Sequence, residues 1–284
     1  MTHQLTKKQH FVPNFYLKAW TGSDGKLHRW DLKESKWQTM APKATFTEPY
    51  FYEEDAGSPD NRVENVLGKM ESDCAPIFKT LNEIAAKSLP SVRSALQKEC
   101  DKDPSIEGAL KRFIVYQYLR VPGAIDHKRG EIEGTTLSDA DKEFLLNPGR
   151  FVESGYDYVA PKFNSLKVLL SYSQGKSFLT SDWPCFDIKD ADEAPILGEE
   201  IGTNADVVMK MPIGPKLVAL LYHRDRFYKD LQEHVPTTLV VSCPGPDVNN
   251  MNALMVQQAE RFIVSDRSVG FVANLAKKRK KTGW

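Results

Sequence analysis

The spacing of hydrophobic residues divides the chain into strand-like ends and a helical middle. Residues 26–32 and 36–40 alternate apolar and polar side chains around a charged turn, which is typical of a β-hairpin. Residues 49–52 form a third strand candidate. From 60 to about 88, apolar residues recur at steps of three and four, which predicts a long helix that Pro76 should kink or break.

The same periodicities predict the remaining elements. Further helices are expected at 92–100, 105–121, 138–146, 161–172 and 249–260. Further strands are expected at 177–181, 206–211, 216–222, 238–242 and 262–265, with a turn at 212–215. Strand-rich ends around a helical middle predict the α+β class, with both ends contributing to one antiparallel or mixed sheet.

Length and composition indicate one globular domain. We expect residues 1–276 to form it, with the helical middle at about 60–172 and a basic tail at 277–284. With 38 basic and 38 acidic residues, net charge favours neither nucleic acid nor a membrane as partner. No apolar run approaches the roughly 20 residues that cross a bilayer, and no signal-peptide core is present, so we expect a cytoplasmic protein.

Cysteine usage and the absence of known motifs limit the chemistry that we expect. None of the four cysteines forms a C-x-x-C pair, so a structural zinc site is not expected and the thiols should be reduced. Glycine-rich phosphate loops and the dinucleotide-binding fingerprint are also absent from the sequence. We therefore predict no metal and no cofactor.

Residues 9–20 combine His10 with aromatic side chains around Pro13. Pro13 is typical of the first position of a helix, and His10 would then lie near free backbone N–H groups, which favour anions. A neutral imidazole can exchange a proton near neutral pH. His10 is therefore a candidate catalytic residue, or one that locks the loop, and Tyr16 on the following helical turn is a candidate binding residue.

Two glutamates and a glutamine–arginine pair are further candidates. Glu64 and Glu71 are seven residues apart and share one flank of the long predicted helix. There they would hold a divalent cation or orient His10, or else face solvent or pair with an arginine. Gln117 and Arg120 are three apart and would form an anion clamp. Alternatively, Arg120 would form a buried ion pair with one of the glutamates.

The last candidates lie in the C-terminal half. Ser181 and Asp182 lie at the end of a predicted strand, where loops carry reactive groups on a rigid scaffold. Asp182 is a candidate catalytic residue and Ser181 a candidate binding residue or nucleophile, unless they form a turn. No G-x-S-x-G elbow surrounds Ser181. Asn249 and Asn252 would share a helix face and bind a ligand, unless Asn249 is an N-cap. The basic residues at 277–281 would be solvated or contact nucleic-acid phosphate.

The order of these motifs resembles the uncharacterised prokaryotic family DUF4238 over roughly residues 9 to 265. The resemblance rests on the following residues, in order: His10, Phe11, Val12 and Pro13; Tyr16 and Leu17; Glu64 and Glu71; Gln117, Arg120 and Pro122; Thr180, Ser181, Asp182 and Pro184; Asn249 and Asn252. The family name implies no activity, so the resemblance bears on the fold more than on the function.

Two classes of function fit these residues. The enzyme hypothesis is a metal-independent phosphodiester hydrolase, such as an RNase-like toxin or defence effector. In it His10 transfers a proton, Arg120 stabilises the phosphate and Glu64 or Glu71 orients His10, with RNA or another anionic ligand as partner. The alternative is a non-catalytic binding module, or a partner-interaction protein whose partner is encoded nearby, in which the same residues form a buried polar network. Both hypotheses depend on whether the six scattered candidates His10, Glu64, Glu71, Gln117, Arg120 and Asp182 meet.

Overall fold

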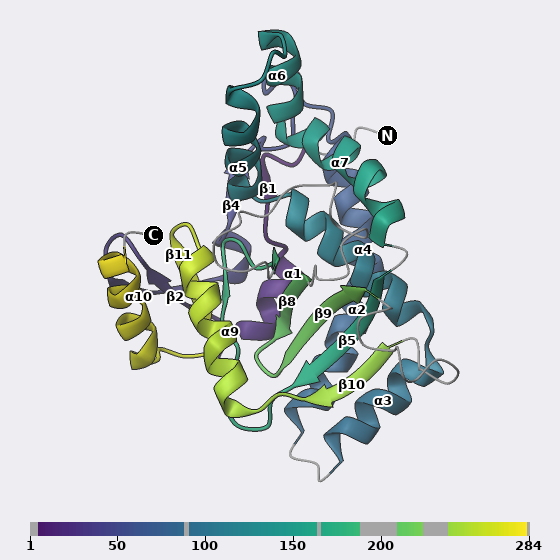
Figure 1. Cartoon of the computed structure of the whole chain (residues 1–284), viewed down its shortest axis with the longest axis vertical. Coiled ribbons are helices and arrows are strands. Elements are labelled where there is room, and N and C mark those ends of the chain that lie inside the picture. The colour runs from purple at the N-terminus through teal and green to yellow at the C-terminus, as the bar shows by residue number, and fades with distance from the viewer. Residues whose placement is uncertain (1–4, 88–90, 164–165, 188–208, 224–237, 283–284) are drawn as a thin grey trace.

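Two β-sheets, a short two-stranded ladder and a set of helices make up the fold (Figure 1). The computed structural model describes residues 5–87, 91–163, 166–187, 209–223 and 238–282. Strands lie in the N- and C-terminal parts of these ranges, and helices at 62–163 fill the part between them, so the expected α+β class is confirmed. Among these residues, no helix is both long and apolar enough to span a membrane.

The larger sheet is mixed and lies in the C-terminal half of the chain. Its strands follow the order β10-β5-β9-β8-β7, and only β10 and β5 run parallel. Their bounds are β5 Leu166–Tyr172, β7 Phe186–Asp187, β8 Met209–Gly214, β9 Leu217–His223 and β10 Thr238–Ser242.

The second sheet joins the two ends of the chain, as expected. Its strands β3, β2, β11 and β6 are antiparallel, with bounds Lys36–Met40, Leu27–Asp31, Phe262–Ser265 and Thr180–Ser181. The predicted hairpin is confirmed, since Trp30 faces Trp37 across β2 and β3. A short ladder pairs β1 (Lys8–His10) with β4 (Thr47–Pro49).

Helices cover the larger sheet and extend beyond it. Helices α2 (Arg62–Ala86), α3 (Val92–Lys102) and α4 (Ser105–Leu119) contact β8, β10 and β5 respectively. Figure 1 shows α5 (Pro122–Glu133), α6 (Asp139–Leu146) and α7 (Pro148–Phe163) as a projection at the top. The remaining helical segments are α1 Asn14–Leu17, η1 Lys18–Trp20, η2 Pro42–Ala44, α9 Gly245–Gln258 and α10 Gly270–Thr282.

One large hydrophobic core and one smaller core hold these layers together. The larger core packs the N-terminal aromatic residues, including Tyr16 and Trp20, against α2, α4 and the five-stranded sheet. The smaller core lies between the second sheet and helices α9 and α10, with Trp30, Ile263 and Met255 among its members. The functional candidates therefore lie around two separate packed centres.

The structure corrects three predicted elements in the first two-thirds of the chain. Residues 161–172 do not form one helix, because α7 ends at Phe163 and Leu166–Tyr172 is strand β5. The predicted strand at 49–52 lies earlier, at Thr47–Pro49. Helix α2 is not broken at Pro76, since buried side chains on both sides, such as Cys74 and Leu81, keep it packed.

Other boundaries move or appear anew. Helix α4 ends at Leu119, before Pro122. Helix α5, which the sequence pattern did not predict, begins at Pro122. Strand β8 extends through the predicted turn to Gly214, and the expected strand residues 206–208 lie outside the described ranges. The basic residues 277–281 belong to α10.

Candidate functional site

The backbone of His10 is the point where three segments meet. His10 ends β1 opposite Thr47 of β4. Its carbonyl oxygen accepts a hydrogen bond from Nη2 of Arg120 at 2.5 Å. The hydroxyl of Tyr52 lies 3.1 Å from the same oxygen. The segment that contains His10 is thereby fixed to the end of α4.

Arg120 lies at the centre of this network and is almost completely buried, with 1% of its surface exposed. It is the residue that ends α4. Besides its bond to His10, its Nη1 donates to Oε1 of Glu71 at 2.8 Å and its Nε donates to the Tyr52 hydroxyl at 3.3 Å. The charges and hydrogen bonds of Tyr52 and Glu71 outweigh desolvation and raise the pKa of Arg120. The expected ion pair between Arg120 and a glutamate therefore forms with Glu71.

The two glutamates on α2 lie in different electrostatic environments. Glu71 is the partly exposed partner of Arg120, with 24% of its side chain accessible. Among the described residues Glu64 has no such ion pair, and its burial raises its pKa to about 7, although the Arg120 charge acts in the opposite direction. The nearby charges of Glu71 and Glu53 add to the increase. Glu64 is thus a carboxyl group that changes protonation near neutral pH.

The imidazole of His10 is partly buried and electrically coupled to the same ion pair. Desolvation lowers its pKa, and the charges of Glu71 and Arg120 act on it in opposite directions. The ring also makes a hydrogen bond with the Lys43 backbone. Its Nε2 atom is buried and has no hydrogen-bond partner among the described residues. At neutral pH His10 is therefore a neutral imidazole with an unused ring nitrogen.

Gln117 supports the network from the preceding turn of α4. It is fully buried, and its Nε2 donates to the carbonyl oxygen of Phe11 at 2.9 Å. Its Oε1 is buried without a partner in the described part of the chain. Tyr52, which the sequence analysis did not select, is also buried, and desolvation raises its pKa to about 12. The structure thus brings His10, Glu64, Glu71, Gln117 and Arg120 to one site, and adds Tyr52.

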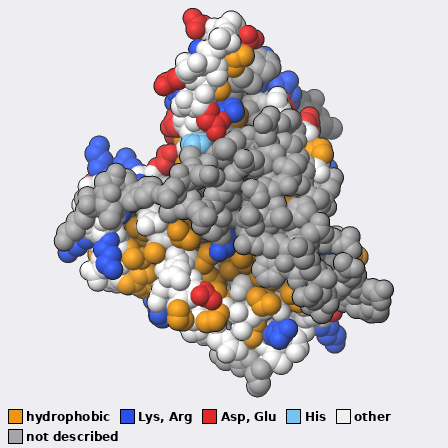
Figure 2. Space-filling view, in the orientation of Figure 1, with side chains coloured by type: hydrophobic (Ala, Val, Ile, Leu, Met, Phe, Trp, Pro, Cys, Tyr) orange, Lys and Arg blue, Asp and Glu red, His pale blue; other side chains and the backbone are white. Residues whose placement is uncertain are grey.

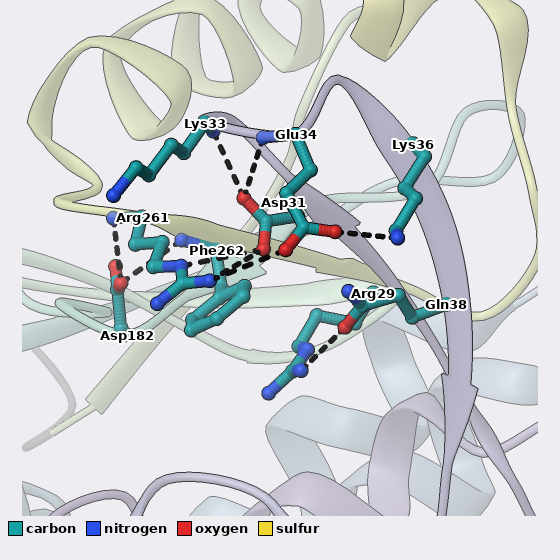
Figure 3. Close-up of polar contacts among 9 residues, drawn as sticks. All are labelled: Arg29, Asp31, Lys33, Glu34, Lys36, Gln38, Asp182, Arg261 and Phe262. Carbon is teal, nitrogen blue, oxygen red and sulfur yellow. Dashed lines mark hydrogen bonds and ion pairs between the residues drawn. The ribbon is translucent and has the colours of Figure 1, made fainter.

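Asp182, the sixth residue expected in the cleft, belongs to a different place in the fold. Its carboxylate accepts the backbone N–H groups of Arg261 and Phe262 at 2.7 and 2.9 Å (Figure 3). It also accepts the backbone N–H of Glu260 at 3.0 Å. Burial raises its pKa to about 6 despite these hydrogen bonds. The sequence expectation that all six residues share one cleft is therefore wrong for Asp182, because its carboxylate holds the start of β11.

Ser181 takes part in a turn beside Asp182. Its hydroxyl donates to the carbonyl oxygen of Trp183 at 2.8 Å and accepts the Trp183 N–H at 3.0 Å. These two contacts correspond to the turn alternative, since the hydroxyl is engaged by the backbone of the next residues. The structure gives Ser181 no contact with the His10 network.

A second polar cluster near Asp182 escaped the sequence analysis. Asp31, which is fully buried at the end of β2, accepts Nη2 of Arg261 at 3.0 Å (Figure 3). The guanidinium of Arg29 lies 3.8 Å from the centroid of the Phe262 ring. The only sequence signal was an aspartate directly after the apolar Trp30 at the end of a predicted strand. Because its partner lies 230 positions away, periodicity did not reveal the pair.

Two further candidates, Tyr16 and Asn252, make contacts within the fold. The Tyr16 hydroxyl lies 2.7 Å from both Oγ1 of Thr180 and the carbonyl oxygen of Pro212. Asn252 is buried, and its side chain bonds the backbone of Leu179 and Ser177. Tyr16 and Asn252 thus connect segments that are far apart in the sequence.

Asn249 lies on the surface of α9. Its Oδ1 accepts Nζ of Lys176 at 2.9 Å. Since α9 begins at Gly245, with Pro244 at its N-cap, Asn249 is inside the helix and its N-cap alternative is wrong. Among the described residues, no group of three or more His, Cys, Asp or Glu side chains is arranged to hold a metal ion.

Comparison with known proteins identifies one relationship. The model of a family described as a protein of unknown function, DUF4238, matches residues 8–268. This match includes all the residues of the His10 network and of the Asp31–Arg261 cluster. No curated protein and no solved structure matches the chain.

Proposed function

The chain belongs to the DUF4238 family, and from its geometry we propose a metal-independent phosphodiester hydrolase that cleaves RNA by proton transfer at His10 and Glu64. One observation carries the proposal: burial shifts the pKa values of two groups beside the same Arg120–Glu71 ion pair in opposite directions. The pKa of His10 is lowered, so its imidazole is neutral. The pKa of Glu64 is about 7, so a large fraction of its carboxyl is protonated. Groups tuned in this way are typical of acid–base pairs.

The proton balance of RNA cleavage fits this pair. Nε2 of His10 takes the proton of a ribose 2′-hydroxyl as the 2′ oxygen attacks phosphorus. The bond from phosphorus to the 5′ oxygen breaks, and the leaving oxygen takes the proton of Glu64. The products are a 2′,3′-cyclic phosphate and a 5′-hydroxyl. Because Nε2 is covered in the structure, the substrate hydroxyl reaches it when a covering group moves.

Arg120 has a different role from the phosphate clamp that the sequence suggested. Its Nε, Nη1 and Nη2 atoms all donate to groups of the protein itself. Arg120 is therefore proposed as a positioning residue that keeps the His10 backbone and Glu71 in place. Cleavage of cellular RNA by such an enzyme would make it a toxin or a defence effector.

A nuclease assay in EDTA tests the proposal. We expect the wild-type protein to cleave RNA to cyclic phosphate ends and to leave DNA of the same sequence intact, because DNA lacks the 2′-hydroxyl. His10→Ala and Glu64→Gln should each lower the rate by about 100-fold or more. Glu133→Gln, which replaces an exposed carboxyl on α5, is the matched control and should cleave at the wild-type rate.

For the comparison to hold, the melting temperature of His10→Ala must stay close to that of the wild type, and that of Glu64→Gln must not fall below it. Absence of RNA cleavage by the wild type would remove the proposal. So would cleavage that EDTA abolishes, or a His10→Ala variant as active as the wild type.

The second candidate is a non-catalytic binding or partner-interaction protein. The observation that favours it is the engagement of Arg120, since each of its three side-chain nitrogen atoms donates to a group of the protein. The network contacts His10 through its carbonyl oxygen, so His10→Ala leaves these bonds in place. A stable, inactive His10→Ala variant of an active wild type supports the enzyme, whereas an inactive wild type supports the binding protein.

A further inference from the structure

Two neighbouring pockets lie outside the His10 network and share part of their lining. The first has a volume of about 660 Å³ and lies between η1, α2 and residues 215–216. The second has a volume of about 620 Å³ and lies between α9 and α10. Asp266 lines both pockets, and Nζ of Lys216 in the first lies 3.3 Å from the Lys176 carbonyl oxygen in the second. We refer to this pair as the two-pocket groove.

The two-pocket groove concentrates positive charge in a chain whose formal net charge is zero. Two acidic residues line it, Glu83 and Asp266. Each already has a basic neighbour within the groove, Lys79 at 3.9 Å and Arg267 at 4.0 Å. Among the described residues, six basic side chains line the groove against these two acidic ones; besides Lys79 and Arg267 they are Lys18, Lys176, Lys216 and Lys278. Such a local excess attracts a polyanion.

Acidic and basic side chains gather on different parts of the surface. In Figure 2, acidic side chains gather on the projection formed by α5 and α6, and basic side chains gather at the edge where α10 lies. A ligand with several negative charges would thus be directed toward the α10 side of the molecule, where the second pocket opens.

Groups suited to nucleotide bases line the second pocket together with the lysines. Phe271 is 42% exposed, which is unusual for a large apolar side chain. The amide side chains of Asn249 and Asn274 line the same pocket. An exposed aromatic ring provides a stacking surface for a base, and amides can bond base edges. This combination favours a single-stranded nucleic acid over a lipid surface, which needs positive charge and no base contacts.

We propose that the two-pocket groove binds single-stranded nucleic acid, with phosphates along the lysines that line it and a base stacked on Phe271. The groove also leads toward the His10 network. Phe78 lines the first pocket and Glu71 lies seven residues earlier on α2, about 10 Å along the helix axis. A strand in the groove would therefore extend toward Glu71, a continuation that rests on the proposed hydrolase function.

Fluorescence anisotropy with a labelled 2′-O-methyl RNA of about 12 nucleotides tests binding. This probe has no free 2′-hydroxyl, so binding is measured apart from cleavage. The affinity of the wild type should fall steeply between about 50 and 200 mM salt. The triple variant Lys18→Gln/Lys176→Gln/Lys278→Gln should bind at least about tenfold more weakly. Its plot of log affinity against log salt should be less steep by about 2, since each lost phosphate contact removes about 0.7.

Two further variants separate the proposal from general charge effects. Phe271→Ala should lower affinity about fivefold or more without changing the salt slope, because stacking releases no counterions. The control Lys33→Gln/Lys69→Gln/Lys98→Gln removes the same charge from exposed lysines that do not line the groove, and should bind as the wild type does.

Several outcomes overturn the proposal. These are no binding by the wild type at low salt, equal losses in the two triple variants, or an unchanged Phe271→Ala variant. Binding to phosphatidylserine vesicles without binding to the oligonucleotide would assign the groove to a membrane instead. Groove-dependent binding without RNA cleavage supports this proposal and removes the hydrolase. Cleavage that does not depend on the groove lysines supports the hydrolase and removes the groove as its binding site.

Discussion

The guanidinium of Arg120 and the carboxylate of Glu71 form a 2.8 Å ion pair that joins the end of α4 to the middle of α2. The arginine is 1% exposed and the glutamate 24% exposed, so the pair lies at the boundary between core and solvent. Because the same guanidinium holds the His10 carbonyl oxygen, one side chain connects three separate segments. This pair determines where the titrating groups of the site lie.

Replacement of Arg120 by lysine should destabilise the protein strongly. A single ammonium group cannot reach Glu71, Tyr52 and the His10 carbonyl oxygen together, so buried polar groups lose their partners. We expect Arg120→Lys to lower the free energy of unfolding by about 3 kcal/mol or more in urea denaturation. Arg129→Lys, at a half-exposed ion pair on α5, is the control and should cost well under about 1 kcal/mol. Equal effects of the two variants would contradict this role.

Stability should fall as pH rises through the titration range of Glu64. Its pKa is raised from 4.5 to about 7 in the folded protein, so the folded state holds more protons than the unfolded state between these values. The resulting loss is on the order of 3 kcal/mol between pH 4.5 and 7. Glu64→Gln should flatten this part of the profile and be more stable than the wild type at pH 8. Parallel profiles for the two proteins would show that Glu64 is not the titrating group.

The pH dependence of RNA cleavage should be bell-shaped if the proposed function holds. Activity rises as the imidazole of His10 loses its proton, at a pH below 6.5, and falls as Glu64 loses its proton near 7. The optimum therefore lies between these two values. In initial-rate measurements, the residual activity of Glu64→Gln should lack the alkaline decrease. An alkaline limb that survives in this variant would assign the acid to another residue.

Gly149 of α7 lies so close to the Tyr52 backbone that a side chain at this position should destabilise the protein. A Cβ built on Gly149 would lie 2.2 Å from the Tyr52 carbonyl oxygen, so α7 would have to move. We expect Gly149→Ala to lower the free energy of unfolding by about 2 kcal/mol. Gly68→Ala on α2 is the matched control, since nothing lies within 4 Å of its Cβ and alanine should stabilise the helix by about 0.5–1 kcal/mol. Thermal unfolding of both variants measures the difference.

Local patterns predicted much of the fold because they report on single elements. The alternation that ends at Trp30 and restarts near Trp37 predicted the hairpin. The same logic failed at Leu166, Leu169 and Leu170, whose spacing fits a helix. Strand β5 lies between β10 and β9, and the side chains on both of its faces are buried, so its sequence is a nearly continuous apolar run. Periodicity alone cannot separate such a strand from a buried helix.

The candidate site was predicted in part for a related reason. Residue type and helical spacing selected Glu71 and Arg120, and their pairing across two helices was among the alternatives that the sequence left open. Sequence spacing does not report burial, so the full engagement of Arg120 and the raised pKa of Glu64 could not be predicted. The sequence analysis wrongly placed Asp182 with the His10 network. An aspartate at the end of a strand can be reactive or can accept backbone N–H groups, and the local sequence does not distinguish these two roles.

The pairing of β2 with β11 has a consequence for how the chain reaches its native state. Strand β2 is synthesised early, yet its neighbour β11 and the arginine that neutralises buried Asp31 come 230 positions later. During translation, the β2 edge of the N-terminal hairpin stays unpaired and the Asp31 carboxylate lacks its arginine partner until β11 has been synthesised. The second sheet is therefore completed late, after most of the chain has been synthesised. A nascent chain that stalls before residue 261 exposes the unpaired edge of β2, which chaperones and proteases can bind.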